Sequence, residues 1–336
     1  MLRMSSESPS VTISGPHVQQ TLAAVVRALR QGESWSQARK LIAARRVRIG
    51  GEVCLDAARR LKEGDIVEVV AQAAPRPAGP DEIVIRHLDR DIVVVEKPAG
   101  MCTVRHPAER AWKDRRRALS PTLEDLVRWQ IRRKEESKGE SKGGKRQRPR
   151  LRIVHRLDKE TSGLVVFART VPAEQGLGKQ FQKHTVIRKY LAIVPGHVKA
   201  QTVRSQLVRD RGDGRRGSRG SSHTPGLGKL AVTHIDVVEK LAAHTLLSCR
   251  LETGRTHQIR IHLAELGHPL CGEKVYDRKP GAPPAPDRAG QRLALHAVEL
   301  GFVHPTRGGN LHWTMPLPAD LERLLDALRA RSTRAK

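Results

Sequence analysis

The sequence predicts an α+β protein, with a mixed, mainly antiparallel sheet and flanking helices, preceded by a small αβ domain. Strands dominate the long central part of the chain, where apolar runs of strand length recur. Helical spacing of apolar residues is clearest near the two ends of the chain. Because strands and helices do not alternate regularly, a doubly wound parallel sheet is not expected.

The small domain is predicted over residues 17–70. Its first helix follows from Leu22, Val25, Val26 and Leu29, which fall on one helical stripe. The further expected elements are a helix over Ser36–Ala44 with Ser34 or Ser36 as N-cap, a hairpin turning at Gly50-Gly51, and a strand over Ile66–Val70. We expect residues 1–16 to be disordered and the Ala/Pro-rich residues 71–82 to form a linker.

The larger domain is predicted over residues 83–330, and its elements are read from apolar patterns. Expected strands cover Ile92–Val95, Leu164–Phe167, Leu191–Val194, Leu247–Leu251, which alternates as if one face were wet, and Arg292–Pro305. A short helix is expected over Ile261–Leu266, ended by Gly267, and a last helix carries Leu321, Leu324, Leu325 and Leu328 on one stripe. Two basic segments, 132–150 and 209–228, lack a packable pattern and are predicted to be mobile insertions. They could follow phosphates nonspecifically or be surface without a role.

The charge balance favours a polyanionic partner. The 336 residues include 62 Lys and Arg against 35 Asp and Glu, a formal net charge of +27. Each phosphate that a cation neutralises releases counterions, so this excess is typical of nucleic-acid binding. Solubilising surface charge is the plain alternative. No apolar run approaches the roughly 18–20 residues that span a bilayer, so a membrane partner is not expected.

The cysteines and the N-terminus predict a cytoplasmic protein. Four cysteines lie far apart without a CxxC pair, which argues against both a zinc site and a disulfide framework. The first ten residues, MLRMSSESPS, lack the apolar core of a secretory signal.

The segment Ile153–Thr170, IVHRLDKETSGLVVFART, is the first candidate for chemistry. It joins the carboxylate of Asp158 to a basic approach, His155 and Arg156, and a small-residue turn before an apolar strand. A fixed positive charge close to a carboxylate keeps it ionised and nucleophilic. An ordinary turn role for Asp158 is the alternative. HRLD is similar to the HRD loop of protein kinases, but the extra leucine, the missing DFG and the missing Gly-rich loop argue against a kinase.

The second candidate is the stretch Leu251–Asp277, which places Arg255, His257 and Arg260 close together. In an extended chain the side chains of Arg255 and His257 lie on one face and that of Arg260 on the other. One face could therefore hold phosphate while the other points into a cleft. A basic edge strand is the alternative. No zinc-ligand spacing is present. The loose glycine pattern at Gly226–Ala231 follows a basic loop instead of a strand, so it fails as a dinucleotide site.

Three further places are candidate site neighbours. Tyr190, in Arg188-Lys189-Tyr190 at the head of a strand, could stack on an extruded base or exchange a proton, or simply pack. Lys97 opens a turn shaped by Pro98 and Gly100. His296 and His304 lie in the strand expected near the C-terminus.

Five stretches, spanning about residues 83–320 in the right order, resemble the RluA-type pseudouridine synthases. They are DIVVVEKPAG, HRLDKETSGLVVFART, IRKYLAIVPG, LETGRTHQIRIHLAELGHPLCGEKVYD and LALHAVELGFVHP. The stretch SQARKLIAARRVRIGGEVCLDAARRLKEGDIV resembles the RNA-binding domain shared with ribosomal small-subunit protein four. In it, Arg45 stands where that family usually has glycine and Gly50 where asparagine is usual.

The resemblance implies a sheet of the pseudouridine synthase type and assigns roles to residues. Asp158 matches the catalytic aspartate, Tyr190 the active-site tyrosine, and Arg260 the arginine that pairs with the aspartate. Arg156 matches a residue that helps displace the flipped base. Further RNA contacts are expected from Lys97, Arg255 and His257 in the larger domain and from Arg39, Lys40, Arg45, Arg46 and Arg48 in the small one.

The resulting hypothesis is a cofactor-free and metal-free isomerase that converts uridines of RNA to pseudouridine after base flipping. Ribosomal RNA is the expected substrate, transfer RNA is the other, and the enzyme is expected to be a monomer. Asp158 could form an ester with the sugar or act through a glycal. A non-catalytic RNA-binding or ribosome-assembly factor with the same fold is the alternative function.

Overall fold

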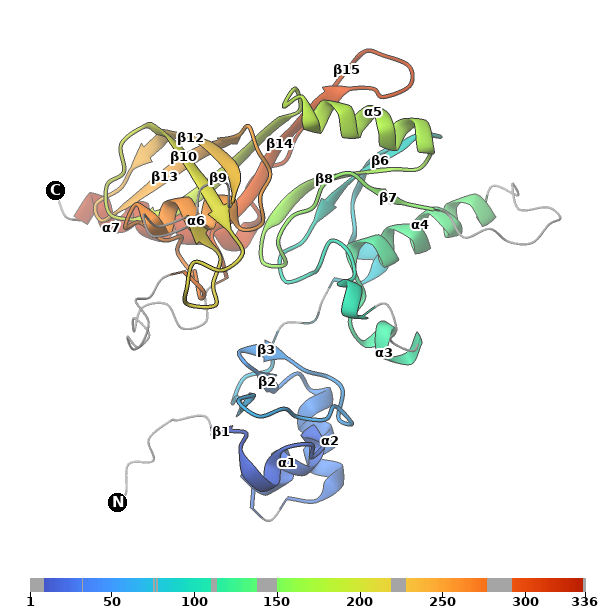
Figure 1. Cartoon of the computed structure of the whole chain (residues 1–336), viewed down its shortest axis with the longest axis vertical. Helices are drawn as coiled ribbons and strands as arrows, with labels where there is room; N and C mark the ends of the chain where they lie inside the picture. Colours follow the sequence, from blue (N-terminus) through green and yellow to red (C-terminus); the bar gives the residue numbers. More distant parts are fainter. Residues whose placement is uncertain are drawn as a thin grey trace. The chain divides into compact units, whose positions relative to one another are not determined.

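The structure, a computed structural model, describes residues 9–334 except 32, 75, 77, 110–113, 138–149, 219–227 and 277–291. The chain divides into two compact units (Figure 1). The N-terminal unit comprises Met1–Pro77 with His106–Pro121, and the C-terminal unit comprises Ala78–Arg105 with Thr122–Lys336. The division after Pro77 falls inside the predicted linker. Residues His106–Pro121, expected in the larger domain, instead group with the N-terminal unit.

The N-terminal unit has a four-stranded sheet in the order β1-β4-β2-β3. Its elements are β1 (Ser10–Thr12), α1 (Leu22–Leu29), α2 (Trp35–Ala43), β2 (Val47–Ile49), β3 (Glu52–Val53), β4 (Ile66–Val69) and α3 (Asp114–Leu119), with short 3-10 turns at Gly15–His17 and Pro107–Glu109. Both α1 and α2 bury one stripe against the sheet, and for α1 this is the stripe that its apolar spacing predicts. The hydroxyl of Ser34 caps α2 by accepting a hydrogen bond from the Gln37 amide.

The start of the N-terminal unit is more ordered than the sequence predicts. The prediction of disorder up to residue 16 is wrong for residues 9–16, because β1 pairs with β4 and the side chain of Ile13 is fully buried.

Arg45 has φ +62° and Gly50 has φ +57°, both in the left-handed region. That conformation costs a non-glycine residue about 1–2 kcal/mol, which is the physical reason why glycine suits the position that Arg45 holds.

The C-terminal unit is organised around an eleven-stranded sheet, counted over the described residues. Its main path runs β11-β10-β12-β13-β9-β14-β8-β6-β5, with β15 beside β14 and β7 beside β8. Only the pairing of β14 with β8 is parallel among those described, so the predicted mixed, mainly antiparallel class is confirmed. The strands are β5 (Ile85–Leu88), β6 (Ile92–Lys97), β7 (Arg152–Ile153), β8 (Ser162–Ala168), β9 (Ile187–Pro195), β10 (Gln201–Val208), β11 (Gly217–Ser218), β12 (Lys229–Lys240), β13 (His244–Leu251), β14 (Leu295–Val303) and β15 (Asn310–Thr314).

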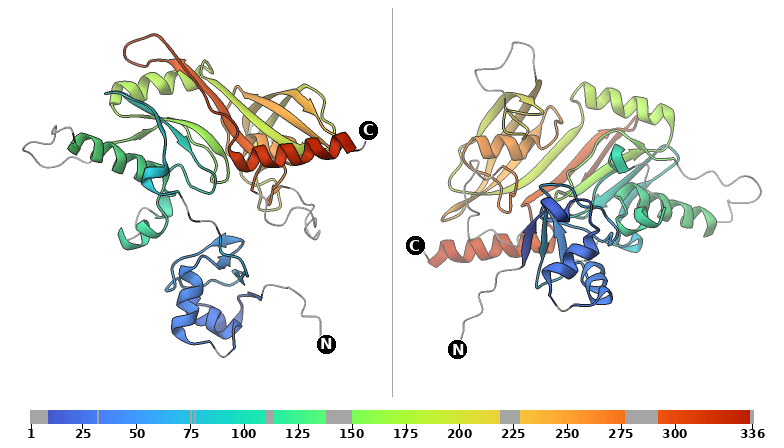
Figure 2. Two further views of the ribbon diagram at one scale, coloured as in Figure 1. Left: turned by 180° about the vertical axis from the view of Figure 1, so that it is seen from behind. Right: turned by 60° about the horizontal axis from the view of Figure 1, so that its bottom comes forward.

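Helices cover this sheet on both faces (Figure 2). They are α4 (Leu123–Ser137), α5 (Val171–Gln182), α6 (Gln258–Glu265) and α7 (Ala319–Arg334), after a 3-10 turn at Pro80–Glu82. In β6, Val93 and Val95 pack with α4, whereas Ile92 and Val94 pack with α5. This alternation explains why the strand is a continuous apolar run. β13 is also buried on both faces around Ser248, so the expected wet face is absent there.

The entry into β8 requires glycine at position 163. Gly163 has φ +128°, and a Cβ built on it would lie 2.3 Å from the carbonyl oxygen of Ala297 on β14. Any side chain would therefore push the two parallel strands apart. The close pairing fixes where the turn that carries Asp158 ends and β8 begins.

Parts of both predicted insertions have defined structure. Helix α4 continues to Ser137, and Arg132 pairs with Glu136 one turn away, so the expectation fails for residues 132–137. Residues 209–218 form a turn that ends in β11, where Ser218 binds Glu265 of α6. Polar and charged contacts stabilise these residues, and a search for apolar patterns in the sequence cannot detect such contacts. Residues 138–149 and 219–227 of these segments lie outside the described part of the chain.

Candidate active site

A cavity of about 610 Å³ opens in the C-terminal unit. It is lined by the loop before β8, the end of α5, the start of β9 and the loop between β13 and α6. Its size suits a ligand of nucleoside dimensions. Asp158, Tyr190 and Arg260, which the sequence predicts to act together, all line it.

Asp158 lies between two nitrogen-bearing side chains from the same neighbouring segment. Its Oδ2 is 3.8 Å from Nη1 of Arg260, and its Oδ1 is 3.9 Å from Nε2 of His257. Both distances exceed hydrogen-bond length, so neither His257 nor Arg260 is hydrogen-bonded to the carboxylate of Asp158. The side chain keeps 17% of its surface exposed, which leaves it accessible from the cavity.

Hydrogen bonds from Lys97 hold the loop that carries Asp158. The Lys97 side chain is fully buried, and its Nζ donates to the carbonyl oxygens of Pro98, Lys159 and Thr161 at 2.7–3.0 Å. Burial lowers the pKa of Lys97 to about 7, although only the ammonium form has three donors for three acceptors. The predicted RNA contact is therefore corrected: Lys97 is buried away from any phosphate and instead holds the turn that carries Asp158.

Arg260 is held rigidly by a carboxylate that the sequence interpretation did not single out. Its Nε and Nη2 donate to the two oxygens of Glu273 at 2.8 and 2.7 Å, a bidentate pair. Burial lowers the pKa of Arg260, but the hydrogen bonds and charge of Glu273 raise it overall. Its remaining nitrogen, Nη1, is the one that faces Asp158. Glu273 lies in the quoted GEKVYD stretch, which was the available signal.

The loop between β13 and α6 is shaped by buried Gln258. Its Oε1 accepts from the Thr253 hydroxyl and the Arg255 amide, and its Nε2 donates to β12 at Val232 and Thr233. The helix begins at Gln258, earlier than expected, so the extended-chain interpretation of this stretch is wrong. The turn brings His257 and Arg260 to the same carboxylate instead of opposite faces.

Tyr190 and Arg188 project from the same face of β9, two residues apart. Burial raises the pKa of Tyr190, and the charge of Arg188 opposes this shift. A phenol that retains its proton is suited to stacking more than to acting as a base. The guanidinium of Arg188 lies over the Phe181 ring and donates to the carbonyls of Leu251 and Glu252, so it ties β9 to the His257 loop.

His155 and Arg156, expected to form a basic approach, have different environments. The Val166 amide donates to Nε2 of His155, whose ring stacks on Phe181, and burial lowers the pKa of His155 to about 3. His155 is therefore neutral. Arg156 is exposed and lines the cavity, so it alone supplies charge from this pair.

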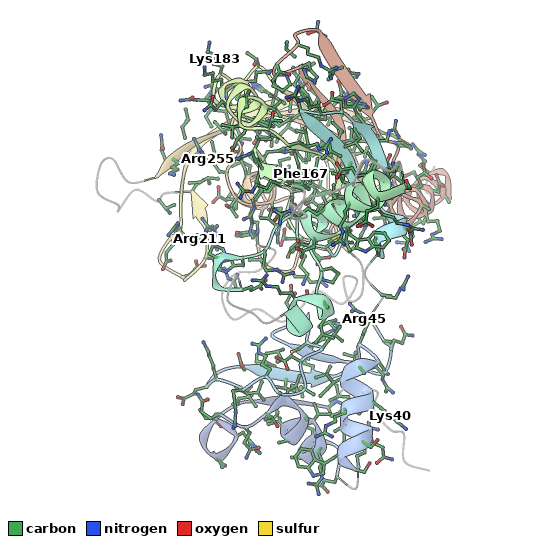
Figure 3. The ribbon with its side chains drawn as sticks, turned by 90° about the vertical axis from the view of Figure 1, so that its right-hand side faces the viewer. Lys40, Arg45, Phe167, Lys183, Arg211 and Arg255 are labelled. Carbon is green, nitrogen blue, oxygen red and sulfur yellow. The ribbon has the colours of Figure 1, made fainter. Side chains whose placement is uncertain are left out.

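The other predicted RNA contacts lie on surfaces of the two units (Figure 3). Arg255 lines the cavity, and its Nε donates to the carbonyl of Leu230. Arg39 and Lys40 are exposed on α2. Arg45, Arg46 and Arg48 are half-buried, and Arg45 and Arg46 each donate one hydrogen bond to the backbone of their own unit. Arg45 and Arg46 thus serve the fold as well as any ligand.

The two histidines expected as site neighbours lie away from the cavity lining. His296 binds Ser162 and His304 binds Asp89, and neither histidine lines the cavity. Within the described residues, no group of three or more His, Cys, Asp and Glu side chains could hold a metal ion. None of the four cysteines forms a disulfide, and only Cys102 is exposed. No helix in the described ranges is long and apolar enough to cross a membrane.

Comparisons with known proteins identify the families to which the two units are similar. The family model described as RNA pseudouridylate synthase matches residues 91–265, and the S4 domain model matches residues 20–67. Ribosomal large subunit pseudouridine synthase D of Zymomonas mobilis is 39% identical over 272 residues, covering 76% of each chain. The protein of that name from Escherichia coli K12 is 32% identical over 338 residues, covering 96% of this chain and 94% of the relative. The solved human RNA pseudouridylate synthase domain containing 1 matches with TM-score 0.54 and 25% identity, covering 76% of this chain and 98% of that one.

These matches define an RNA-modifying enzyme fold with an appended RNA-binding module. The chain belongs to the RNA pseudouridylate synthase family. The predicted enzyme class, an RNA pseudouridine synthase, and the predicted RNA-binding domain, here an S4 domain, are both confirmed.

Proposed function

We propose that this enzyme converts specific uridines of large-subunit ribosomal RNA to pseudouridine, as a cytoplasmic monomer. The observation that carries the proposal is Asp158, accessible in a nucleoside-sized cavity and flanked by Arg260 and His257. The relatives are named as ribosomal large subunit pseudouridine synthases, which supports ribosomal RNA over transfer RNA.

The proposed reaction begins when the target uridine leaves its helix, at a cost of about a few kcal/mol. Exposed Arg156 and Arg255 line the cavity, where they can offset this cost by contacts to the RNA. Tyr190 stacks against the base, since its phenol faces the cavity and keeps its proton.

Asp158 then acts on the sugar, and Arg260 stabilises its negative charge. The bond between C1′ and N1 breaks, the uracil turns in the pocket, and C5 bonds to C1′. The C5 proton is lost and N1 gains one, so the product is an isomer of the substrate. Both the ester and the glycal route need an ionised carboxylate in this place.

Asp158→Asn tests the catalytic assignment because it keeps the shape and removes the charge. Wild-type enzyme should release tritium from RNA that contains uridine labelled at carbon 5, and Asp158→Asn should release none above background. Equal thermal stability of the two proteins controls for misfolding. Release by the variant would show that Asp158 is not the catalytic group.

The substrate and the non-catalytic alternative are tested in cells. Pseudouridines are mapped in a deletion strain and in a strain carrying Asp158→Ala. Loss of the same large-subunit sites in both strains supports the proposed enzyme. Losses confined to transfer RNA contradict the ribosomal substrate, and intact modification in both strains favours a binding factor.

A further inference from the structure

Tyr276 and His257 form a pair next to Asp158 that the proposed reaction does not yet use. The Tyr276 hydroxyl lies 2.8 Å from Nδ1 of His257, and Nε2 of the same ring faces Oδ1 of Asp158 at 3.9 Å. The two rings meet edge to face, with centroids 5.6 Å apart. The pair thus links a buried tyrosine to the reactive carboxylate.

The hydrogen bond determines which ring nitrogen of His257 carries the proton. If the Tyr276 hydroxyl donates to Nδ1, the proton of a neutral ring sits on Nε2 and points at Asp158. The reverse arrangement would set a lone pair of Nε2 against an ionised carboxylate, which is repulsive. Burial lowers the pKa of His257, so the ring is neutral at pH 7.

Tyr276 is fixed in place by the surrounding core and contacts both groups that flank the carboxylate. Its ring packs with Leu207 of β10, Ala231 of β12 and Ile261 of α6, and it is only 9% exposed. The Arg260 guanidinium lies 5.4 Å from its ring centroid. One tyrosine therefore supports Arg260 through its face and His257 through its hydroxyl.

The backbone of His257 is also unusual. It has φ +59° and is the N-cap of α6, so a bulky residue occupies the left-handed region at the start of the helix. Such a conformation costs of order 1–3 kcal/mol and tends to persist where it serves a site. Here it directs the imidazole at Asp158 instead of into solvent.

We infer that His257 and Tyr276 are positioning residues: the Tyr276 hydroxyl holds His257 as the Nε2–H tautomer, and this N–H donates to Oδ1 of Asp158 while Arg260 holds Oδ2. A closure of about 1 Å brings Nε2 within hydrogen-bond length. The inference rests on the proposed function and replaces the expected RNA contact of His257 by an action on the carboxylate.

Single-turnover tritium release at saturating enzyme, together with RNA binding, tests this inference. His257→Leu should slow the chemical step about 10- to 100-fold, because a misplaced catalytic group costs up to about that factor, and should leave the Kd for RNA unchanged. His257→Gln should recover most of the rate, since its amide offers an N–H at the reach of Nε2. Tyr276→Phe keeps the packing and should slow the same step by a smaller factor.

The double variant decides whether the two residues act together. Tyr276→Phe should add no further loss to His257→Leu, because the hydroxyl acts only through the imidazole. Independent losses would overturn the inference, as would an unchanged rate with weaker RNA binding in His257→Leu. Absence of tritium release by the wild-type enzyme would instead refute the proposed function, and the inference with it.

Discussion

Two buried basic residues next to the Asp158 loop and two exposed basic residues on α2 are held in opposite ways. Arg260 and Lys97 are buried, and each makes several hydrogen bonds of defined direction. Arg39 and Lys40 on α2 are exposed, with no hydrogen bond or ion pair to another described residue. The first pair provides geometry, and the second provides charge.

The two environments predict which measurement each residue should affect. A buried, multiply bonded cation fixes an atom to within a fraction of an ångström, so its loss should lower the rate of the chemical step. An exposed cation contributes through counterion release, so its loss should change RNA affinity and its salt dependence. Three substitutions test the contrast, in decreasing order of expected effect.

Glu273→Gln should have the largest effect, because it leaves Arg260 buried without its anionic partner. Removing one member of a buried pair costs about 3–5 kcal/mol of unfolding free energy. Tritium release should fall about 100-fold as Arg260 shifts from Asp158. Urea unfolding and single-turnover rates measure the two effects. The control is Glu239→Gln, which breaks an exposed pair with Arg329 and should cost less than about 1 kcal/mol.

The same pair predicts a pH dependence. Burial raises the pKa of Glu273, but the hydrogen bonds and charge of Arg260 outweigh this and lower it below 4.5. A carboxyl whose folded pKa is depressed adds stability that is complete above its unfolded pKa and lost as pH falls through the folded value. The stability difference between wild type and Glu273→Gln should stay constant from pH 6 to 8 and shrink below pH 4.5. A difference that persists undiminished at pH 3 would contradict the ion pair.

Lys97→Met should have the next largest effect. It leaves the carbonyls of Pro98, Lys159 and Thr161 without their donor, and one buried unsatisfied group costs about 1–3 kcal/mol. We expect the turn that carries Asp158 to shift and the chemical step to slow about 10-fold with little change in RNA affinity. Lys179→Met on the exposed side of α5 is the control, with an expected change within about 0.5 kcal/mol. A weaker RNA affinity at full rate would restore Lys97 to RNA binding.

Patterns in the sequence predicted the elements whose burial is periodic or continuous. Ile92–Val95 and Leu164–Phe167 are continuous apolar runs because both faces of these strands are covered. The resemblance carried by HRLD and TGRTHQIR pointed to Asp158 and Arg260, which the fold brings together from distant segments.

Contacts between distant residues escaped prediction for physical reasons. Whether Lys97 faces solvent or three carbonyls depends on the turn at Lys159–Thr161, which lies more than sixty residues away in the chain. The early start of α6 depends on Gln258 bonding to β12. β1 is too short to show a period, and it is stabilised by its pairing with β4 and by the packing of Val11 against the core.

The combined variant Arg39→Ala with Lys40→Ala should have the smallest effect on catalysis and the clearest effect on salt dependence. Each phosphate contact contributes about 0.7–0.9 to the slope of log affinity against log salt, so two lost contacts should reduce it by about 1.4–1.8. The rate at saturating RNA should not change. Arg132→Ala with Arg133→Ala is the matched control, because these cations already pair with Glu136 and Asp81. An equal slope change in both variants would mean that RNA responds to total charge, and that α2 is not a binding face.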